Sequence, residues 1–220
     1  MRRHMFRWSP ARIIAGAFGS ISFIGSILLY LPWGHMPGQS ITYVDALYTA
    51  VSALCVTGLS IVDTAAVFNP FGQVILAVLI QVGGLGVSTM GAGVLLMLGR
   101  KVGIRQRNLI HDTMNLDSYS GVVRFLRTLF ATTVFIEIIG AFLGYFVFRR
   151  DYEMMESIGL SIFHSISSFN NAGLTILTKE RSMEMYAEDP FMLILTTALV
   201  FVGGLGFIVI RCLLYTYPSP

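Results

Sequence analysis

Two short glycine-containing segments have the residue types and spacing of a cation site built from backbone carbonyls. Ser52–Ser60 read SALCVTGLS and Ser167–Thr175 read SSFNNAGLT, so that Gly58 and Gly173 are 115 residues apart. Backbone carbonyls can replace the hydration shell of a cation without placing full charges inside a membrane. They must then point the same way along an extended strand, and glycine reaches the required conformations at low steric cost. For either segment taken alone, a glycine at a helix C-cap is the alternative interpretation.

A second repeated string follows each segment at a similar distance. Gly83–Gly86 and Gly203–Gly206 both read GGLG and are 120 residues apart. Elements that recur in the same order indicate an internal repeat, and two such instances favour the carbonyl site over the C-cap. GGLG also resembles part of a dinucleotide fingerprint, but the preceding strand and the third glycine are absent. We interpret the first string, together with Gly91 and Gly93, as a small-residue surface against which another helix packs.

The elements that must position these segments are helices in a membrane. The 220 residues are 55% hydrophobic and 12% charged, with a mean hydropathy of +0.71, far from the balance of soluble domains. Four apolar runs approach or exceed the roughly 20 residues that cross a bilayer, and two shorter runs suit re-entrant helices. The predicted spans are Ile13–Leu31, Phe71–Gly99, Thr128–Phe148 and Phe191–Ile210, and the predicted pore helices are Tyr43–Leu54 and Ser157–Phe169. The predicted fold class is therefore an all-α membrane protein with two helix–pore helix–filter–helix repeats, four full spans and two re-entrant pore helices.

The same pattern divides the chain and orients it. Residues 1–99 form the first pore repeat with an N-terminal cytoplasmic segment, 100–120 a cytoplasmic linker, 121–210 the second repeat, and 211–220 an atypical tail. Basic residues gather before the first span and in the loop over 100–127, whereas Pro32–Pro70 contains neither Lys nor Arg. The positive-inside rule then places the N-terminus in the cytoplasm. Arg149 and Arg150 oppose this orientation but are outnumbered.

Outside these segments the sequence offers little chemistry. Glu137 is the one acid inside a predicted span, which calls for a functional hypothesis. That hypothesis is a polar contact with a neighbouring helix or the pore wall, and the alternative is a protonated or hydrogen-bonded packing residue. The cysteines and histidines lack metal-ligand spacing, and no catalytic constellation is present, so we expect no enzyme. The basic residues flank spans, which argues against nucleic-acid binding.

An acidic cluster lies in the region predicted to face outward. It either attracts cations to the pore mouth or is an ordinary solvated loop. Its members are Asp151, Glu153, Glu156, Glu180, Glu184, Glu188 and Asp189.

At the strings ALYTAVSALCVTGLS, QVGGLG, FHSISSFNNAGLT and FVGGLGF the chain resembles the Trk/Ktr/HKT superfamily of potassium transporters, most closely the bacterial Ktr/Trk membrane subunits. The resemblance runs from about residue 11 to 210. It implies a selectivity filter in which potassium is bound by backbone carbonyls. The implied filter residues are Val56, Thr57, Gly58, Asn171, Ala172 and Gly173. Glycine at both filter positions implies a preference for potassium.

The resemblance also implies function and partners. It predicts potassium uptake across the bacterial plasma membrane by a multi-pass, pore-forming subunit. The predicted partners are a cytosolic nucleotide-binding regulatory ring, a second copy of the full-length subunit and the lipid bilayer. No covalently bound cofactor is expected; potassium is the substrate and sodium a candidate coupling ion. Family members have four units and this sequence has two, so we expect a truncated form. The alternative function is a non-transporting membrane fragment or an assembly scaffold that retains the pore fold.

Overall fold

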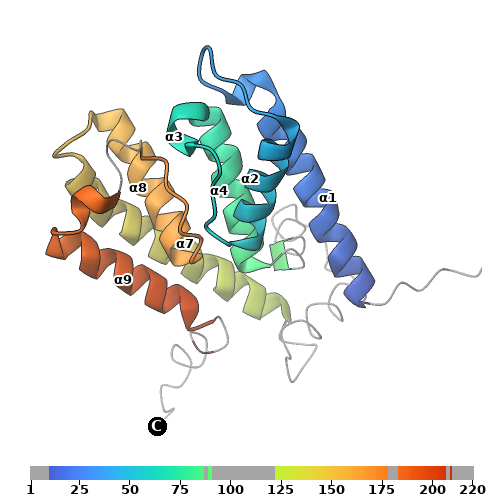
Figure 1. The fold of residues 1–220 in the computed structure, drawn as a ribbon. Coiled ribbons are helices and arrows are strands. Elements are labelled where there is room, and N and C mark those ends of the chain that lie inside the picture. The colour runs from blue at the N-terminus through green and yellow to red at the C-terminus, as the bar shows by residue number, and fades with distance from the viewer. Residues whose placement is uncertain (1–9, 87–88, 91–121, 178–182, 207–208, 210–220) are drawn as a thin grey trace, which may run out of the picture.

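The described part of the chain is helical. The computed structural model describes residues 10–86, 89–90, 122–177, 183–206 and 209, drawn in colour in Figure 1. Among these residues the only β-type pairing is an isolated bridge between His35 and Phe68. The α-helices are α1 (Pro10–Tyr30), α2 (Tyr43–Cys55), α3 (Thr64–Val67), α4 (Pro70–Leu85), α7 (Val122–Phe148), α8 (Met154–Phe169) and α9 (Pro190–Gly204). Two 3₁₀ turns, η1 (Pro32–Gly34) and η3 (Met183–Tyr186), complete the described elements.

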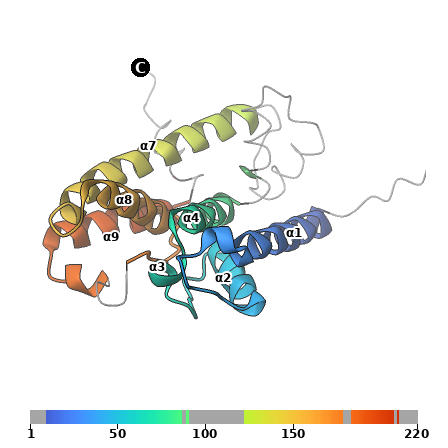
Figure 2. The same ribbon diagram turned by 90° about the horizontal axis from the view of Figure 1, so that it is seen from above.

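The helices form two similar groups that meet along α4 and α8. In the first group α1 and α4 both pack against α2, and in the second α7 and α9 both pack against α8. Figures 1 and 2 show the blue-to-green group beside the yellow-to-red group. Each group therefore repeats the predicted order of a long helix, a short helix, a glycine-containing turn and a further helix. The short helices α2 and α8 lie where the sequence predicted them.

The last helix of each group begins in the same way. Asn69 and Asp189 cap α4 and α9 with side-chain oxygens that accept hydrogen bonds from two backbone N–H groups of the first turn. Pro70 and Pro190 follow at the first helical position, where the missing N–H would have no partner within the helix. The two caps are 120 residues apart, the same offset as the GGLG strings. The repeat therefore extends to the start of these helices.

Two of the four predicted spans begin with described helices that are too short to cross a membrane by themselves. Among the described helices, α1 and α7 are long and apolar enough to cross a membrane, whereas α4 has 16 residues and α9 has 15. Both short helices end within GGLG, and the last glycine of each string has a left-handed backbone, with φ of 83° at Gly86 and 76° at Gly206. Side chains are strained at such φ values, so the string ends these helices instead of continuing them. The predicted linker 100–120 and tail 211–220 lie outside the described residues.

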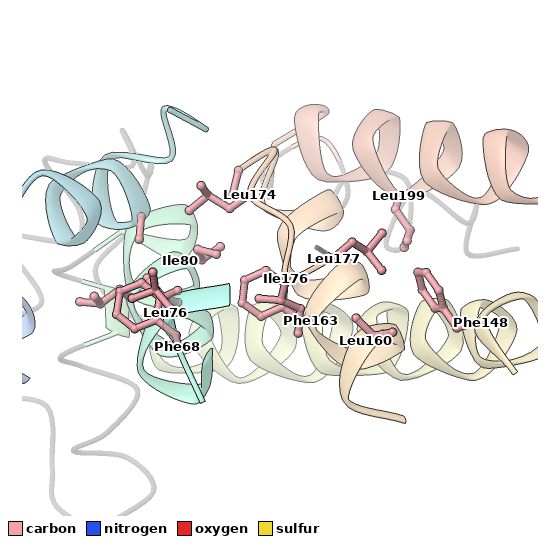
Figure 3. Close-up of a cluster of buried hydrophobic side chains, with 14 of the residues drawn as sticks. Phe68, Leu76, Ile80, Phe148, Leu160, Phe163, Leu174, Ile176, Leu177 and Leu199 are labelled. Atoms are coloured by element: carbon pink, nitrogen blue, oxygen red, sulfur yellow. The ribbon is translucent and has the colours of Figure 1, made fainter. Parts of the chain in front are cut away.

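One buried apolar cluster crosses the boundary between the two groups. Figure 3 shows Phe68, Leu76 and Ile80 on one side and Phe148, Leu160 and Phe163 on the other.

Large apolar side chains also cover the outside of the helices. The apolar side chains that are more than half exposed include Phe23, Ile24, Val74, Val78, Phe135, Ile138, Phe142, Ile194 and Phe201. An apolar exterior of this extent is typical of a surface that meets lipid or another protein.

Candidate ion site at two glycine turns

The chain that leaves α2 is held in an uncommon conformation by the end of that helix. Val56 has φ 57° and ψ 40°, and Gly58 has φ 73°, so left-handed residues stand on both sides of Thr57. The Thr57 N–H donates to Ser52 O at 3.0 Å. The Ser52 hydroxyl donates to Leu59 O at 2.5 Å and contacts the Thr57 hydroxyl at 2.9 Å. One buried serine thus clamps both ends of a three-residue turn.

The chain that leaves α8 repeats this arrangement 115 residues later. Asn171 has φ 59° and Gly173 has φ 67°. The Ala172 N–H donates to Ser167 O at 2.8 Å, and the Ser167 hydroxyl donates to Leu174 O at 2.6 Å. The two turns therefore share their serine clamp and the positions of their left-handed residues.

The carbonyl groups between the clamped ends are the ones left for a ligand. Within the described part of the chain, none of the six predicted filter residues has a carbonyl that accepts a hydrogen bond, whereas the flanking carbonyls of Leu59 and Leu174 do. The two turns also touch each other. A Cβ added to Gly58 would lie 2.6 Å from Ala172 O and 3.6 Å from the Gly173 Cα. The structure thus brings Gly58 against Ala172 and Gly173, more than 100 residues further along the chain.

The predicted C-cap alternative for the glycines does not hold. The left-handed residues nearest the helix ends are Val56 and Asn171, and each glycine lies two residues further on. Asparagine tolerates this conformation well, but for a β-branched valine it is a genuine outlier. Such strain costs about 1–3 kcal/mol and persists only where the surroundings enforce it. Nothing in the pattern of residue types indicates the strain at Val56.

The GGLG strings bring the last helices close to the ends of α2 and α8. A Cβ on Gly83 would collide with Leu54 O, and a Cβ on Gly203 would collide with Phe169 O. Leu54 and Phe169 are themselves 115 residues apart, so this contact is also repeated. The packing interpretation is confirmed for Gly83 and for Gly84, which contacts Asn170. Gly86 has a different role, since it ends α4, and Gly91 and Gly93 lie outside the described residues.

The two short helices direct their C-terminal ends toward the turns. The carbonyl end of a helix carries a partial negative charge, which stabilises cations nearby. Because α2 and α8 end directly before Val56 and Asn170, both helix ends favour a positive charge at the turns. The turns therefore combine carbonyls that have no partner among the described residues with two helix C-termini, both of which attract positive charge.

Glu137 lies next to this site and forms a hydrogen bond that fits both a functional polar contact and a packing role. The Asn170 amide nitrogen donates to Glu137 Oε1 at 3.3 Å and to Gln81 Oε1 at 2.9 Å. Asn170 is the C-cap of α8, and Gln81 belongs to α4, so the contact joins neighbouring helices.

Two members of the acidic cluster have structural roles. Asp189 caps α9 and pairs with Arg150 at 2.6 Å, and Asp151 accepts a hydrogen bond from the Tyr186 hydroxyl at 3.0 Å. The backbone N–H of Met192, with further help from Phe191 and Arg150, holds the pKa of Asp189 below its usual value. Glu180 lies outside the described residues. Within the described residues no group of three or more His, Cys, Asp and Glu side chains could hold a metal ion.

Comparison with known proteins identifies the family. Residues 10–217 match the TrkH family, described as cation transport protein. The Ktr system potassium uptake protein B of Bacillus subtilis (strain 168) is 35% identical over 204 residues, which are 93% of this chain and 45% of that protein. The potassium/sodium uptake protein NtpJ of Enterococcus hirae is 36% identical over 208 residues, 94% of this chain and 46% of NtpJ. The Ktr system potassium uptake protein B of Vibrio alginolyticus is 36% identical over 212 residues, 95% and 45% of the two chains.

The helices and paired glycine turns thus belong to a class of membrane proteins that transport cations. The chain is a member of the TrkH cation transport family. It spans a little under half the length of the curated relatives it matches.

Proposed function

We propose that this chain forms two units of a potassium pathway through the bacterial plasma membrane. In this proposal the carbonyls of Val56, Thr57 and Gly58 from the first unit, and of Asn171, Ala172 and Gly173 from the second, form part of the selectivity filter. The single observation that carries the proposal is the repeated serine clamp. In both units it engages the carbonyl that follows the glycine and leaves the preceding carbonyls without a partner among the described residues. The potassium uptake named for the relatives supplies the choice of ion.

The proposal includes the membrane arrangement. α1, α4, α7 and α9 are the four spans, with α4 and α9 extending beyond the GGLG breaks, and α2 and α8 are re-entrant. The division into residues 1–99, 100–120, 121–210 and 211–220 and the cytoplasmic N-terminus are parts of the same proposal. A cytosolic nucleotide-binding ring would contact the basic loop over 100–127, which lies mostly outside the described residues. Sodium is proposed as the coupling ion.

Serine substitution of the two glycines tests the filter. At Gly58 the new Cβ would meet Ala172 O, and both glycines have left-handed φ values that a serine rarely adopts. We expect Gly58→Ser and Gly173→Ser each to weaken the preference for potassium over sodium. The matched control is Gly19→Ser, because Gly19 has open space around it.

The assay is growth of a potassium-uptake-deficient host at limiting potassium, together with sodium uptake by the same cells. Unchanged selectivity in both variants would remove the glycines from the filter. A wild-type chain that folds in the membrane together with the units that complete the pore wall, and still restores no uptake, would favour the scaffold alternative.

We further propose that other units of the same kind complete the pore wall, from a longer chain or from a second copy. The boundary inside this chain places Gly84 of α4 against Asn170. The offset of 120 residues makes Gly204 the equivalent of Gly84, and the offset of 115 residues makes Cys55 the equivalent of Asn170. Cys55 is exposed. Where a second copy supplies the next unit, Gly204 of one copy should therefore meet Cys55 of the other.

A disulfide tests this arrangement. In a Cys212→Ser background, Gly204→Cys should form covalent dimers through Cys55 under mild oxidation in membranes. Gly19→Cys on α1 is the control and should not. Equal cross-linking by both variants would contradict the proposed neighbour contact.

A further inference from the structure

Asn170 lies between α8 and the second turn, and its side chain contacts hydrogen-bond acceptors on three helices. It is 8% exposed and directly precedes Asn171, Ala172 and Gly173. Its amide nitrogen lies within hydrogen-bond distance of Gln81 Oε1 (2.9 Å), Ile166 O (2.9 Å) and Glu137 Oε1 (3.3 Å), and these three acceptors share its two N–H groups. These acceptors belong to α4, α7 and α8, so one side chain joins both units at the start of the second turn.

The surrounding residues fit this side chain closely. A Cβ on Gly84 would collide with Asn170 Oδ1, so the glycine makes room for the amide beside α4. Gln81 lies three residues earlier on the same helix face. Gln81 and Glu137 therefore meet at the same amide group. The Ser165 hydroxyl donates to Glu137 O at 2.8 Å and adds a second tie between α7 and α8.

The cluster occurs once, although the fold around it occurs twice. The offset of 115 residues relates Asn170 to Cys55 and Glu137 to Ser22. The offset of 120 residues relates Gln81 to Phe201. Phe201 is apolar and 65% exposed, and Cys55 is exposed. The polar cluster is therefore not a requirement of each unit. It distinguishes the second turn from the first.

The second turn has two further polar ties. The Thr64 hydroxyl, at the start of α3 in the first unit, donates to Thr175 O just past the turn. In the orientation that satisfies both groups, the Asn171 amide donates to Val200 O at 3.2 Å and accepts from Gly204 N at 3.3 Å. Two residues of the first unit, Gln81 and Thr64, therefore form hydrogen bonds at the start of the second turn and just beyond its end.

We propose that Asn170 is a positioning residue that, through Gln81 and Glu137, fixes the start of the second filter turn and thereby sets its preference for potassium. The effect on ion preference rests on the proposed function; the positioning itself does not. Low-dielectric surroundings strengthen buried hydrogen bonds of this kind. The competing explanation is that the cluster only joins α4, α7 and α8.

Amide hydrogen exchange of the purified chain in lipid nanodiscs separates the two explanations. The reporters are the N–H groups of Asn170, Asn171 and Ala172, which donate to Ile166 O (3.0 Å), Ser168 O (3.1 Å) and Ser167 O (2.8 Å). We expect Asn170→Leu and Gln81→Leu each to speed exchange of these amides by about tenfold or more, the loss expected for one buried hydrogen bond. The double variant should add little, because both changes remove the same contact.

Conservative and matched variants sharpen the comparison. Glu137→Gln keeps an acceptor oxygen and should preserve slow exchange, whereas Glu137→Leu should not. Phe201→Leu changes the residue equivalent to Gln81 and is the control. Exchange at Thr57 in the first turn should stay unchanged in every variant.

Two results would overturn the proposal. One is unchanged exchange at residues 170–172 in Asn170→Leu; the other is faster exchange spread evenly along α7 and α8, as expected from helix joining alone. The same samples give the ion readout, because a bound ion stabilises the folded state. Potassium should raise the unfolding temperature more than sodium does in the wild type, and this difference should shrink in Asn170→Leu and remain in Glu137→Gln. A difference that persists undiminished in Asn170→Leu would overturn the effect on preference. A wild type without the difference would count against the proposed function, while the exchange pattern would still decide the positioning.

Discussion

Removing the serine clamp from the second turn should destabilise the chain by a predictable amount. Ser167 is 3% exposed and donates to Leu174 O at 2.6 Å. The variant Ser167→Ala removes the donor and leaves a buried carbonyl without its partner, which costs about 1–3 kcal/mol. The substitution changes little else, because alanine keeps the Cβ and suits the helix end. Ser52→Ala should cost at least as much, since Ser52 also contacts the Thr57 hydroxyl.

The assay is equilibrium unfolding of the chain in mixed micelles, with Ser20→Ala as the matched control. Ser20 is exposed on α1 and donates to Gly16 O at 2.7 Å, so its loss should change the free energy of unfolding by no more than about 0.5 kcal/mol. In transport measurements, the clamp variants should also admit more sodium. The reasoning is refuted if Ser167→Ala loses no more stability than Ser20→Ala.

Two further predictions concern a close approach and a helix cap. Gly83→Ala should lower the free energy of unfolding by about 1–3 kcal/mol because its Cβ would collide with Leu54 O. Gly19→Ala, which has open space, should raise it by about 0.5–1 kcal/mol. Because the pKa of Asp189 in the folded chain lies below its ordinary value of 3.8, the cap contributes stability above that pH, and the contribution is lost as the pH falls through the lowered pKa.

The controls for these predictions are direct. If Gly83→Ala were as stable as Gly19→Ala, the end of α2 at Leu54 would have moved at little cost to make room for the new Cβ. That result would contradict the prediction. Acid unfolding followed by circular dichroism tests the cap, with Asp189→Asn as the variant that keeps the acceptor oxygen and removes the titration. The same dependence on acid pH in Asp189→Asn and in the wild type would exclude the carboxylate as its source.

The positions of the helices could be predicted because apolar runs and their lengths are local properties of the sequence. α2 begins at Tyr43 as expected, and α7 ends at Phe148 as expected. The ends of α4 and α9 could not be predicted in this way, since a glycine in an apolar run does not reveal whether its φ is positive. The Asn69–Pro70 and Asp189–Pro190 pairs are sequence signals for helix starts that apolar runs alone do not reveal.

The candidate site was predictable in part. Gly58 and Gly173 follow from the repeat, and the structure places their turns against each other. The serine clamp was not predicted, although Ser52 and Ser167 occupy equivalent positions in the repeated segments. The cluster around Asn170 was beyond sequence reasoning. Its members come from positions 81, 137 and 170, and only the packing of both α4 and α7 against α8 brings them together.

The central claim is that the two glycine turns bind potassium through their carbonyls. Its most direct test is X-ray diffraction from crystals of the chain grown with rubidium, whose anomalous scattering locates an ion of nearly the size of potassium. We predict an anomalous peak in contact with carbonyl oxygens of both turns, at Gly58 and Gly173 or their two preceding residues, and its loss when sodium replaces rubidium. Ordered turns without rubidium, or rubidium bound only elsewhere on the chain, would contradict the claim.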